Sequence, residues 1–277
     1  MRLISLLGVD FLVRKMILSV LILSACLHIA KSRGLSSEVD IDNEIDVGGP
    51  PRFRQEWVKL SQTPKRLITK NLGQHLELEC EAMGSPPPTI QWFKEDKLLT
   101  VPINIDRYEN NIVTETISQG LAKVKSRLIL NYLLPVHEGT FRCLAQGGSE
   151  KAVAESRLFV INKEGIQFNF TTLIQRNILG AHHKPRVTLW SPTYMDVIGR
   201  EVFLPCKGEG NPRPDTRWVG PQGEMIGSGN DRISALSNGE LRIRSVSWSD
   251  MGVYSCIVSN SLGQDSAETF LYPMQES

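Results

Sequence analysis

The sequence predicts an all-β protein built from two tandem β-sandwiches that are joined by a long connector. Three observations predict this class: a repeated pattern of cysteine, glycine, proline and tryptophan, an alternation of apolar and polar residues around the cysteines, and a globular composition. Of the 277 residues, 41% are hydrophobic and 22% are charged. This composition excludes a disordered polymer and a protein with many membrane spans.

The first 34 residues are predicted to be a signal peptide. Arg14 and Lys15 precede the apolar or small run 16–27, which has the length of a signal-peptide core and is shorter than the roughly 20 residues that span a bilayer. An uncleaved signal anchor is the alternative. Residues 270–277 contain no apolar tail, so we expect neither a second anchor nor a lipid-anchor signal. The mature chain is therefore expected to be secreted, extracellular and not inserted in a membrane.

The charge of the mature chain argues against nucleic acid as its partner. The first 34 residues hold five basic residues and one acidic residue, so the rest carries 26 basic against 29 acidic residues, a formal net charge of −3. Residues 35–53 are predicted to be an acidic flexible tail, because acidic residues recur at every second position from Glu38 to Asp46, before a Gly and Pro cluster. A ligand-contacting arm is the alternative for this tail.

The strongest internal signal is a repeat. Residues 80–92 and 206–218 both read C-x3-G-x-P-x-P-x3-W, and the apolar residues before each second cysteine recur at the same spacings. We therefore expect one domain at 54–162 and a second at 184–274, each near the roughly 100 residues of such a sandwich, and a short tail at 275–277.

Each copy of the repeat resembles an immunoglobulin domain of the intermediate-set or C2 type. The first cysteine lies in an alternating strand, and the tryptophan lies in the next strand across a Gly and Pro turn, which is the arrangement of a buried tryptophan beside an inter-sheet disulfide. The predicted core tryptophans are Trp92 and Trp218. Because the repeat places one pair of cysteines in each module, we expect the disulfides Cys80–Cys143 and Cys206–Cys256.

The two modules differ at the position of the tyrosine corner. Residues 250–256 match the D-x-G-x-Y-x-C pattern of immunoglobulin domains, and Tyr254 is the predicted corner residue. In the first module His137 and Phe141 replace the aspartate and the tyrosine. Phe141 lacks a hydroxyl, so we expect the corner of the first domain to be less constrained.

The connector at 163–183 has the pattern of a half-buried strand. Ile166, Phe168 and Phe170 alternate with polar residues, and Asn169 begins the N-x-[ST] sequon of the chain. We expect a glycan on Asn169, which leaves the three apolar side chains on the opposite side. These side chains either seal the two domains together or form part of a ligand-binding surface, and the two roles are compatible.

Residue patterns typical of enzymes are missing from the sequence. It contains no H-E-x-x-H, G-x-S-x-G, P-loop or G-x-G-x-x-G motif, and disulfide formation removes the cysteines as nucleophiles. His182 and His183 are adjacent but lack further metal ligands at the usual spacing. We therefore expect neither an enzyme, nor a bound metal, nor a cofactor.

Beyond the general immunoglobulin signals, several stretches resemble the insect imaginal morphogenesis protein late-two family, also called neural/ectodermal development factor. They are residues 56–60 with Thr63 and Pro64, 79–85, 180–186, 248–252 and 265–273. The resemblance covers about residues 52–275. The resemblance assigns the family's disulfide and core roles to the four cysteines and the two tryptophans, but it identifies no ligand-contact residue. The connector is longer than is typical of the family.

This resemblance implies a secreted protein that sequesters insulin-like peptide hormones and restrains signalling by the insulin receptor and growth. An exposed apolar patch with a polar rim, on a sheet face, on a sheet edge or in the connector, would be enough for that role. The alternatives are an adhesion or axon-guidance protein that acts through contacts between immunoglobulin domains, and a structural module of the matrix. The sequence does not specify an oligomeric state.

Overall fold

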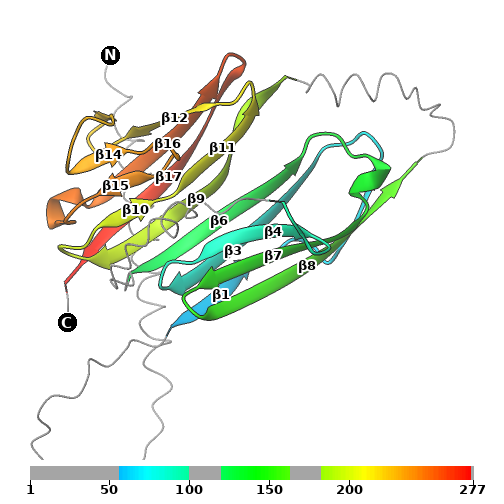
Figure 1. Ribbon diagram of the computed structural model, residues 1–277, viewed down its shortest axis with the longest axis horizontal. Coiled ribbons are helices and arrows are strands. Elements are labelled where there is room, and N and C mark those ends of the chain that lie inside the picture. Colours follow the sequence, from blue (N-terminus) through cyan, green and yellow to red (C-terminus); the bar gives the residue numbers. More distant parts are fainter. Residues whose placement is uncertain (1–55, 100–119, 163–181, 276–277) are drawn as a thin grey trace, which may run out of the picture. The chain divides into compact units, whose positions relative to one another are not determined.

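The computed structural model describes residues 56–99, 120–162 and 182–275, and Figure 1 shows their strands. The regular structure within these ranges is β-strand apart from two single 3₁₀ turns, Pro135–His137 and Trp248–Asp250. The protein is therefore all-β, as predicted. The predicted signal peptide, acidic tail, glycosylation site and apolar connector residues lie outside the described residues.

The first domain forms two sheets. Its strands are β1 (Trp57–Gln62), β2 (Leu67–Asn71), β3 (Leu76–Ser85), β4 (Thr89–Lys94), β5 (Lys97–Leu98), β6 (Leu121–Leu130), β7 (Gly139–Gly147) and β8 (Glu150–Ile161). One sheet has the order β2-β8-β7-β4-β5, and the other contains β1-β3-β6. All neighbours pair antiparallel except β2 and β8.

The second domain repeats this plan. Its strands are β9 (His183–Val197), β10 (Val202–Leu204), β11 (Cys206–Asn211), β12 (Asp215–Val219), β13 (Met225–Ile226), β14 (Ile233–Ala235), β15 (Leu241–Ile243), β16 (Gly252–Asn260) and β17 (Gly263–Met274). One sheet has the order β10-β15-β14. The other contains β9-β17-β16-β12-β13, and β11 also pairs with β9.

The strands follow from residue alternation. In β3 every second residue from Leu76 to Gly84 is buried, and the residues between them include three glutamates at 77, 79 and 81. Strand β6 alternates in the same way, with Ala122, Val124 and Leu128 buried. A period of two places each apolar set on the face that covers the core, which fixes the register of the pairing.

A disulfide and a tryptophan form the centre of each sandwich. Bonds link Cys80 to Cys143 and Cys206 to Cys256, and all four cysteines are fully buried. The indole N–H of Trp92 donates to Ser126 Oγ at 3.0 Å, and that of Trp218 donates to the Gly239 carbonyl at 3.0 Å. Both buried indole donors are therefore satisfied, as a packed core requires.

The corner of the second domain is held by hydrogen bonds and an ion pair. The Tyr254 hydroxyl donates to the Asp250 carbonyl at 3.0 Å, and the buried Asp250 carboxylate accepts two bonds from Arg232 at 2.7 and 2.8 Å. Burial by itself would raise the pKa of Asp250, but the hydrogen bonds from Arg232 and Ser247 outweigh it and lower the pKa. Phe141 is also buried at the equivalent place in the first domain, but it has no hydroxyl to donate such a bond.

The two domains share one sheet. Strand β9 of the second domain pairs antiparallel with β6 of the first, with Leu121 opposite Met195 and Ser126 opposite Leu189. The order is therefore β1-β3-β6-β9-β17-β16-β12-β13. At the irregularity in this pairing, the buried Ser191 hydroxyl donates to the Lys123 carbonyl at 2.7 Å. Backbone pairing and a buried side-chain bond thus join the domains directly.

Candidate functional site

The shared sheet presents one continuous face that spans both domains. A single row of paired residues crosses six strands and contains Lys59, Met83, Lys123, Thr193, Phe270 and Val253. The neighbouring row, which contains Ala122, Tyr194 and Leu271, is buried. Because successive residues of a strand point to opposite sides, the first row faces away from both cores. We call this side the shared face.

On the first domain the shared face is a charge ladder. We use this name for Glu77, Glu79 and Glu81 on β3 with Lys123, Lys125 and Arg127 on β6. Lys123 Nζ lies 3.3 Å from a Glu81 oxygen, Lys125 Nζ lies 3.3 Å from a Glu79 oxygen, and Arg127 Nε lies 3.1 Å from Glu77 and 3.0 Å from Glu79. Three acidic and three basic groups leave the ladder neutral overall.

The environment of Glu79 shows that this ladder is more than loosely paired surface charge. Partial burial would raise the pKa of Glu79, but the positive charges and hydrogen bonds of Lys125 and Arg127 lower it. Gln62 also donates to the Glu79 carboxylate at 3.0 Å. The carboxylate therefore stays ionised and positioned in the middle of the face.

Arg186 carries the charge network from the first domain to the second. Its guanidinium lies 3.1 Å from a Glu77 oxygen and 3.4 Å from Asp265 Oδ2, and the same Asp265 oxygen accepts the Val187 N–H at 2.9 Å. An arginine can bind two carboxylates at once because its donors form a planar fork. Arg186 therefore links β3 of one domain to β17 of the other.

Trp190 lies at the junction of the two domains, beneath two cations of the ladder. The Arg127 guanidinium is 4.5 Å from the centre of the indole ring, and Lys125 Nζ is 5.8 Å from it. Both distances allow a cation–π attraction. The side chain is almost fully buried in this position.

On the second domain the shared face becomes apolar. We call Leu121, Met195, Tyr272, Phe270, Val253, Trp248 and Met251 the apolar strip. Leu121 pairs with Met195, and Met195 pairs with Tyr272, so the strip begins on the first domain and continues onto the second. Trp248 packs edge-on against Tyr272, with 6.0 Å between the ring centres.

Four members of the apolar strip are exposed large side chains: Trp248, Met251, Val253 and Phe270. Isolated exposed apolar residues are common, but a contiguous row beside a polar rim is typical of an interaction surface. The apolar strip and the adjoining charge ladder have this composition, with aromatic and methionine side chains at the centre and charges at one side.

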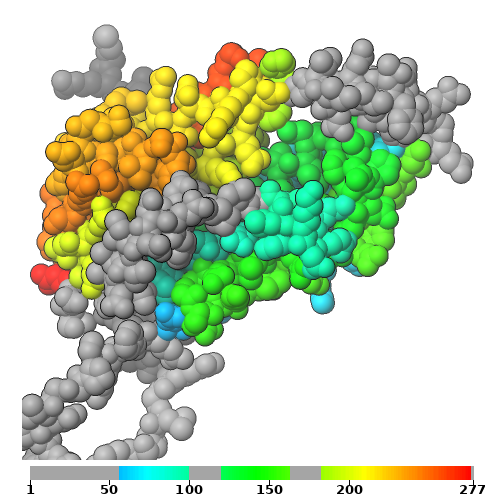
Figure 2. Space-filling view, viewed as in Figure 1, coloured from blue at the N-terminus to red at the C-terminus, as the bar shows by residue number. Residues whose placement is uncertain are grey.

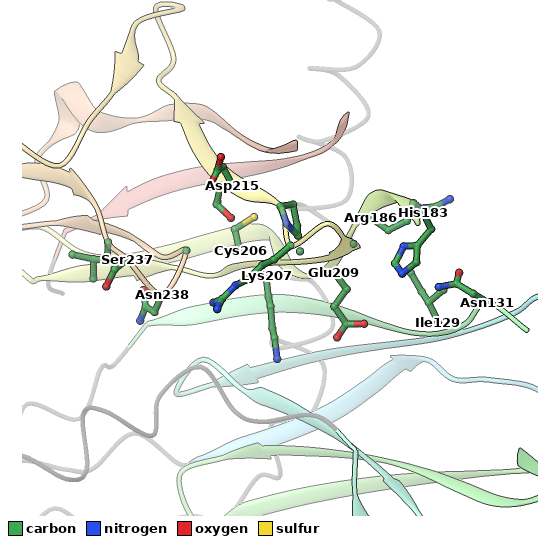
Figure 3. A pocket seen from close by; sticks show the side chains of 17 residues that line it. Ile129, Asn131, His183, Arg186, Cys206, Lys207, Glu209, Asp215, Ser237 and Asn238 are labelled. Carbon is green, nitrogen blue, oxygen red and sulfur yellow. The ribbon is translucent and has the colours of Figure 1, made fainter. Parts of the chain in front are cut away.

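The second domain also carries a groove, and its lining differs from the shared face. A groove of about 1040 Å³ lies along β11 and is lined on other sides by Ile129, Asn131, His183 and residues 236–239 (Figure 3). Its walls carry both signs of charge, including Lys207, Glu209 and Asp215. This polar mixture lacks the aromatic side chains that anchor most protein ligands.

The described ranges contain no group of three histidine, cysteine, aspartate or glutamate side chains that could hold a metal ion. In the same ranges no helix is long and apolar enough to cross a membrane. The four cysteines that the structure describes are joined in disulfides.

Sequence reasoning placed the candidate ligand contacts in the connector, at Ile166, Phe168 and Phe170. These residues and Asn169 lie outside the described residues, so their role stays a prediction. The shared face was missed, although part of its signal is visible: glutamates alternate at 77, 79 and 81, and cations alternate at 123, 125 and 127. Two alternating strands of opposite charge favour pairing with each other.

Comparisons with known proteins agree with this architecture. The immunoglobulin domain family matches residues 57–146 and 184–260. The chain is 30% identical to the neural/ectodermal development factor IMP-L2 of Drosophila melanogaster over 239 residues, or 85% of each chain. It is 28% identical to the Zwei Ig domain protein zig-4 of Caenorhabditis elegans, over 73% of this chain and 74% of that protein.

A solved structure shows the same relationship. The crystal structure of neural ectodermal development factor IMP-L2 superimposes with a TM-score of 0.62 at 27% identity, covering 80% of this chain and 97% of that one. The family match and these relatives place the chain among immunoglobulin-domain proteins rather than enzymes. The chain belongs to the immunoglobulin superfamily and, within it, to the IMP-L2 family of two-domain proteins.

Proposed function

We propose that this protein is secreted and sequesters insulin-like peptides, which limits their access to the insulin receptor. Its membership of the IMP-L2 family and the resemblance of its sequence motifs to that family support this function. Insulin-like peptides present an apolar surface to their receptor, and a soluble protein that covers this surface competes with the receptor. Sequestration requires binding and no catalysis, and two β-sandwiches can supply the surface for it.

The apolar strip is the observation that carries the proposal. It places exposed aromatic and aliphatic side chains, Phe270, Trp248 and Val253 among them, on one sheet face beside ionised groups. Aromatic side chains at the centre of an interface supply most of its binding free energy, and charged groups at the rim set orientation and association rate. We propose that the peptide packs its apolar surface on the apolar strip, with the charge ladder at its edge.

The shared sheet makes this surface preformed. Leu121 comes from the first domain, Met195 and Tyr272 come from the second, and the β6–β9 pairing fixes them in one row. A rigid surface loses little conformational entropy on binding, so more of the contact energy appears as affinity. Separating the domains would remove Leu121 and the charge ladder from the surface, so the second domain alone should bind the peptide more weakly than the whole chain.

Isothermal titration calorimetry with a purified insulin-like peptide tests the proposal. Phe270→Asp should weaken binding at least tenfold, or about 1.4 kcal/mol, because it places a charge in the centre of the apolar strip. Phe159→Asp is the matched control: Phe159 is 38% exposed and Phe270 is 37% exposed, and each lies on the last strand of its domain. The control should bind normally.

Equal affinity of Phe270→Asp and the wild type, with both folded by circular dichroism, would remove the apolar strip from the binding site. An absence of any heat from the wild-type protein at micromolar concentrations would contradict peptide binding itself. In that case adhesion through immunoglobulin domains would become the better account.

A further inference from the structure

The first domain has a second exposed face, on the sheet β2-β8-β7-β4-β5. Strand β8 forms much of it, because its side chains alternate between the core and solvent. Ser156 and Leu158 are buried, and the residues on the other side of the strand are exposed. On this side of β8 the exposed residues are Lys151, Val153, Glu155, Arg157, Phe159 and Ile161, and Glu150 at the start of the strand is exposed as well. Strands β7 and β8 are green in Figures 1 and 2.

Apolar side chains on neighbouring strands widen this face. Leu144 of β7 is paired with Val153, and the exposed Leu67 of β2 is paired with Arg157. The Arg157 guanidinium lies over the Phe159 ring, 5.6 Å from its centre. We call this set of residues the β8 face. It combines apolar groups and charges, as protein interfaces do.

The charges at the centre of the β8 face have no strong partners. Within the described part of the chain, Glu155 forms no ion pair, and the one charged-group contact of Arg157 is with the Phe159 ring. Arg142, which is paired with Glu155 in the sheet, instead binds Asp96 and the Glu95 carbonyl. A carboxylate and a guanidinium thus stand two residues apart on an exposed strand, each available to a group outside the domain.

The order of these residues is self-complementary. If two copies of the face stack with their β8 strands antiparallel and a two-fold axis at Ser156, position 155 of one copy meets position 157 of the other. Glu155 then faces Arg157 twice, and Val153 faces Phe159 twice. Every contact occurs in two equivalent copies, as an isologous interface requires. Moving the axis to position 154 would instead place Lys151 against Arg157, which repels.

We propose that the β8 face is a docking surface for a second copy of this chain, which forms a two-fold dimer centred on Ser156. The sheets stack face to face with their strands nearly aligned, as in other sheet packings. Two Glu155–Arg157 pairs flank the axis, and two Val153–Phe159 contacts lie outside them. The centre of this face is charged and its apolar contacts are few, so we expect a weak dimer that forms at micromolar concentrations. It leaves the apolar strip, which lies on the shared face, free.

Charge reversal in the secreted full-length chain tests this arrangement by analytical ultracentrifugation over a range of about 1–300 μM. Glu155→Arg leaves two arginines at positions 155 and 157, and Arg157→Glu leaves two glutamates. Each single variant should dimerise at least tenfold more weakly than the wild type, because like charges then meet at the axis. The double variant Glu155→Arg with Arg157→Glu should recover wild-type dimerisation, since the exchange preserves both pairs.

Mixing the two single variants gives the sharpest result. The arginine copy and the glutamate copy should form a mixed dimer more readily than either forms with itself, and a fluorescent label on one copy would detect it. Phe159→Asp should prevent dimerisation, whereas Phe270→Asp should leave it unchanged, which separates this surface from the peptide site. Circular dichroism would establish that each variant is folded.

A wild-type chain that stays monomeric throughout the range would overturn the proposal. So would a dimer that both charge reversals leave intact, or single variants that fail to associate when mixed. These results do not depend on whether the chain binds insulin-like peptides, because no peptide is present in the experiment.

Discussion

Truncation of Trp190 tests how the two domains are joined. Trp190 is 8% exposed, pairs with Lys125 in the sheet and lies beneath the Arg127 and Lys125 side chains. The substitution Trp190→Ala removes this aromatic contact from the junction and leaves the β6–β9 backbone pairing to hold the domains together. The free energy of unfolding should therefore fall.

The size of the loss follows from the buried area. A side chain of this type removes roughly 150–250 Å² from water, which corresponds to about 4–6 kcal/mol at about 25 cal/mol per Å² and is an upper bound. Measured truncations of large buried side chains cost about 3–5 kcal/mol, and loss of the cation–π contacts falls within that range. We expect Trp190→Ala to lower the free energy of unfolding by about 3–5 kcal/mol.

Denaturant unfolding followed by circular dichroism measures this loss, and hydrogen exchange locates it. Exchange of the amides in β6 and β9 should become faster, because these strands meet at the junction. Trp57→Ala is the matched control, since Trp57 is 39% exposed and should cost about 1 kcal/mol or less. A loss from Trp190→Ala no larger than that of the control, with unchanged exchange in β6, would refute this account of the junction.

Three further predictions concern other parts of the chain. The pKa of Asp250 is lowered in the folded state, so its pair with Arg232 should stabilise the protein fully above the unfolded pKa near 4. This contribution should disappear as the pH falls through the lower folded pKa. Asp250→Asn should therefore make the free energy of unfolding less dependent on pH in the acid range. Asn169 should carry a glycan in secreted material, so enzymatic deglycosylation should reduce the mass and Asn169→Gln should abolish that change. Phe168→Asp with Phe170→Asp should lower stability first and peptide affinity second, and a double variant that changes neither would show that the connector is an ordinary flexible linker.

Local sequence features were sufficient to predict the core of each sandwich. The repeated spacing from Cys80 to Trp92 and from Cys206 to Trp218 specifies a cysteine strand, a proline turn and a tryptophan strand in both modules. Alternation in residues 76–84 then identifies which side chains face the core. These features depend on residues that are close along the chain, so they can be recognised in a single sequence.

The shared sheet could not be predicted in the same way. Strand β6 alternates like any half-buried strand, and alternation shows which side is buried but not which strand occupies each edge. The pairing of Lys123 with Thr193 joins residues about 70 positions apart through backbone groups, which every residue type except proline provides. The apolar strip depends on this pairing, because Leu121 and Tyr272 become neighbours only when β6, β9 and β17 lie side by side.

Competition with the receptor tests the central claim most directly. A labelled insulin-like peptide would be bound to immobilised insulin-receptor ectodomain while the secreted chain is added at increasing concentration. Receptor-bound peptide should fall to near zero once the chain is well above its dissociation constant for the peptide. Phe270→Asp should shift this curve at least tenfold, and Phe159→Asp should not. Receptor binding that is unaffected by a large excess of folded wild-type chain would contradict sequestration.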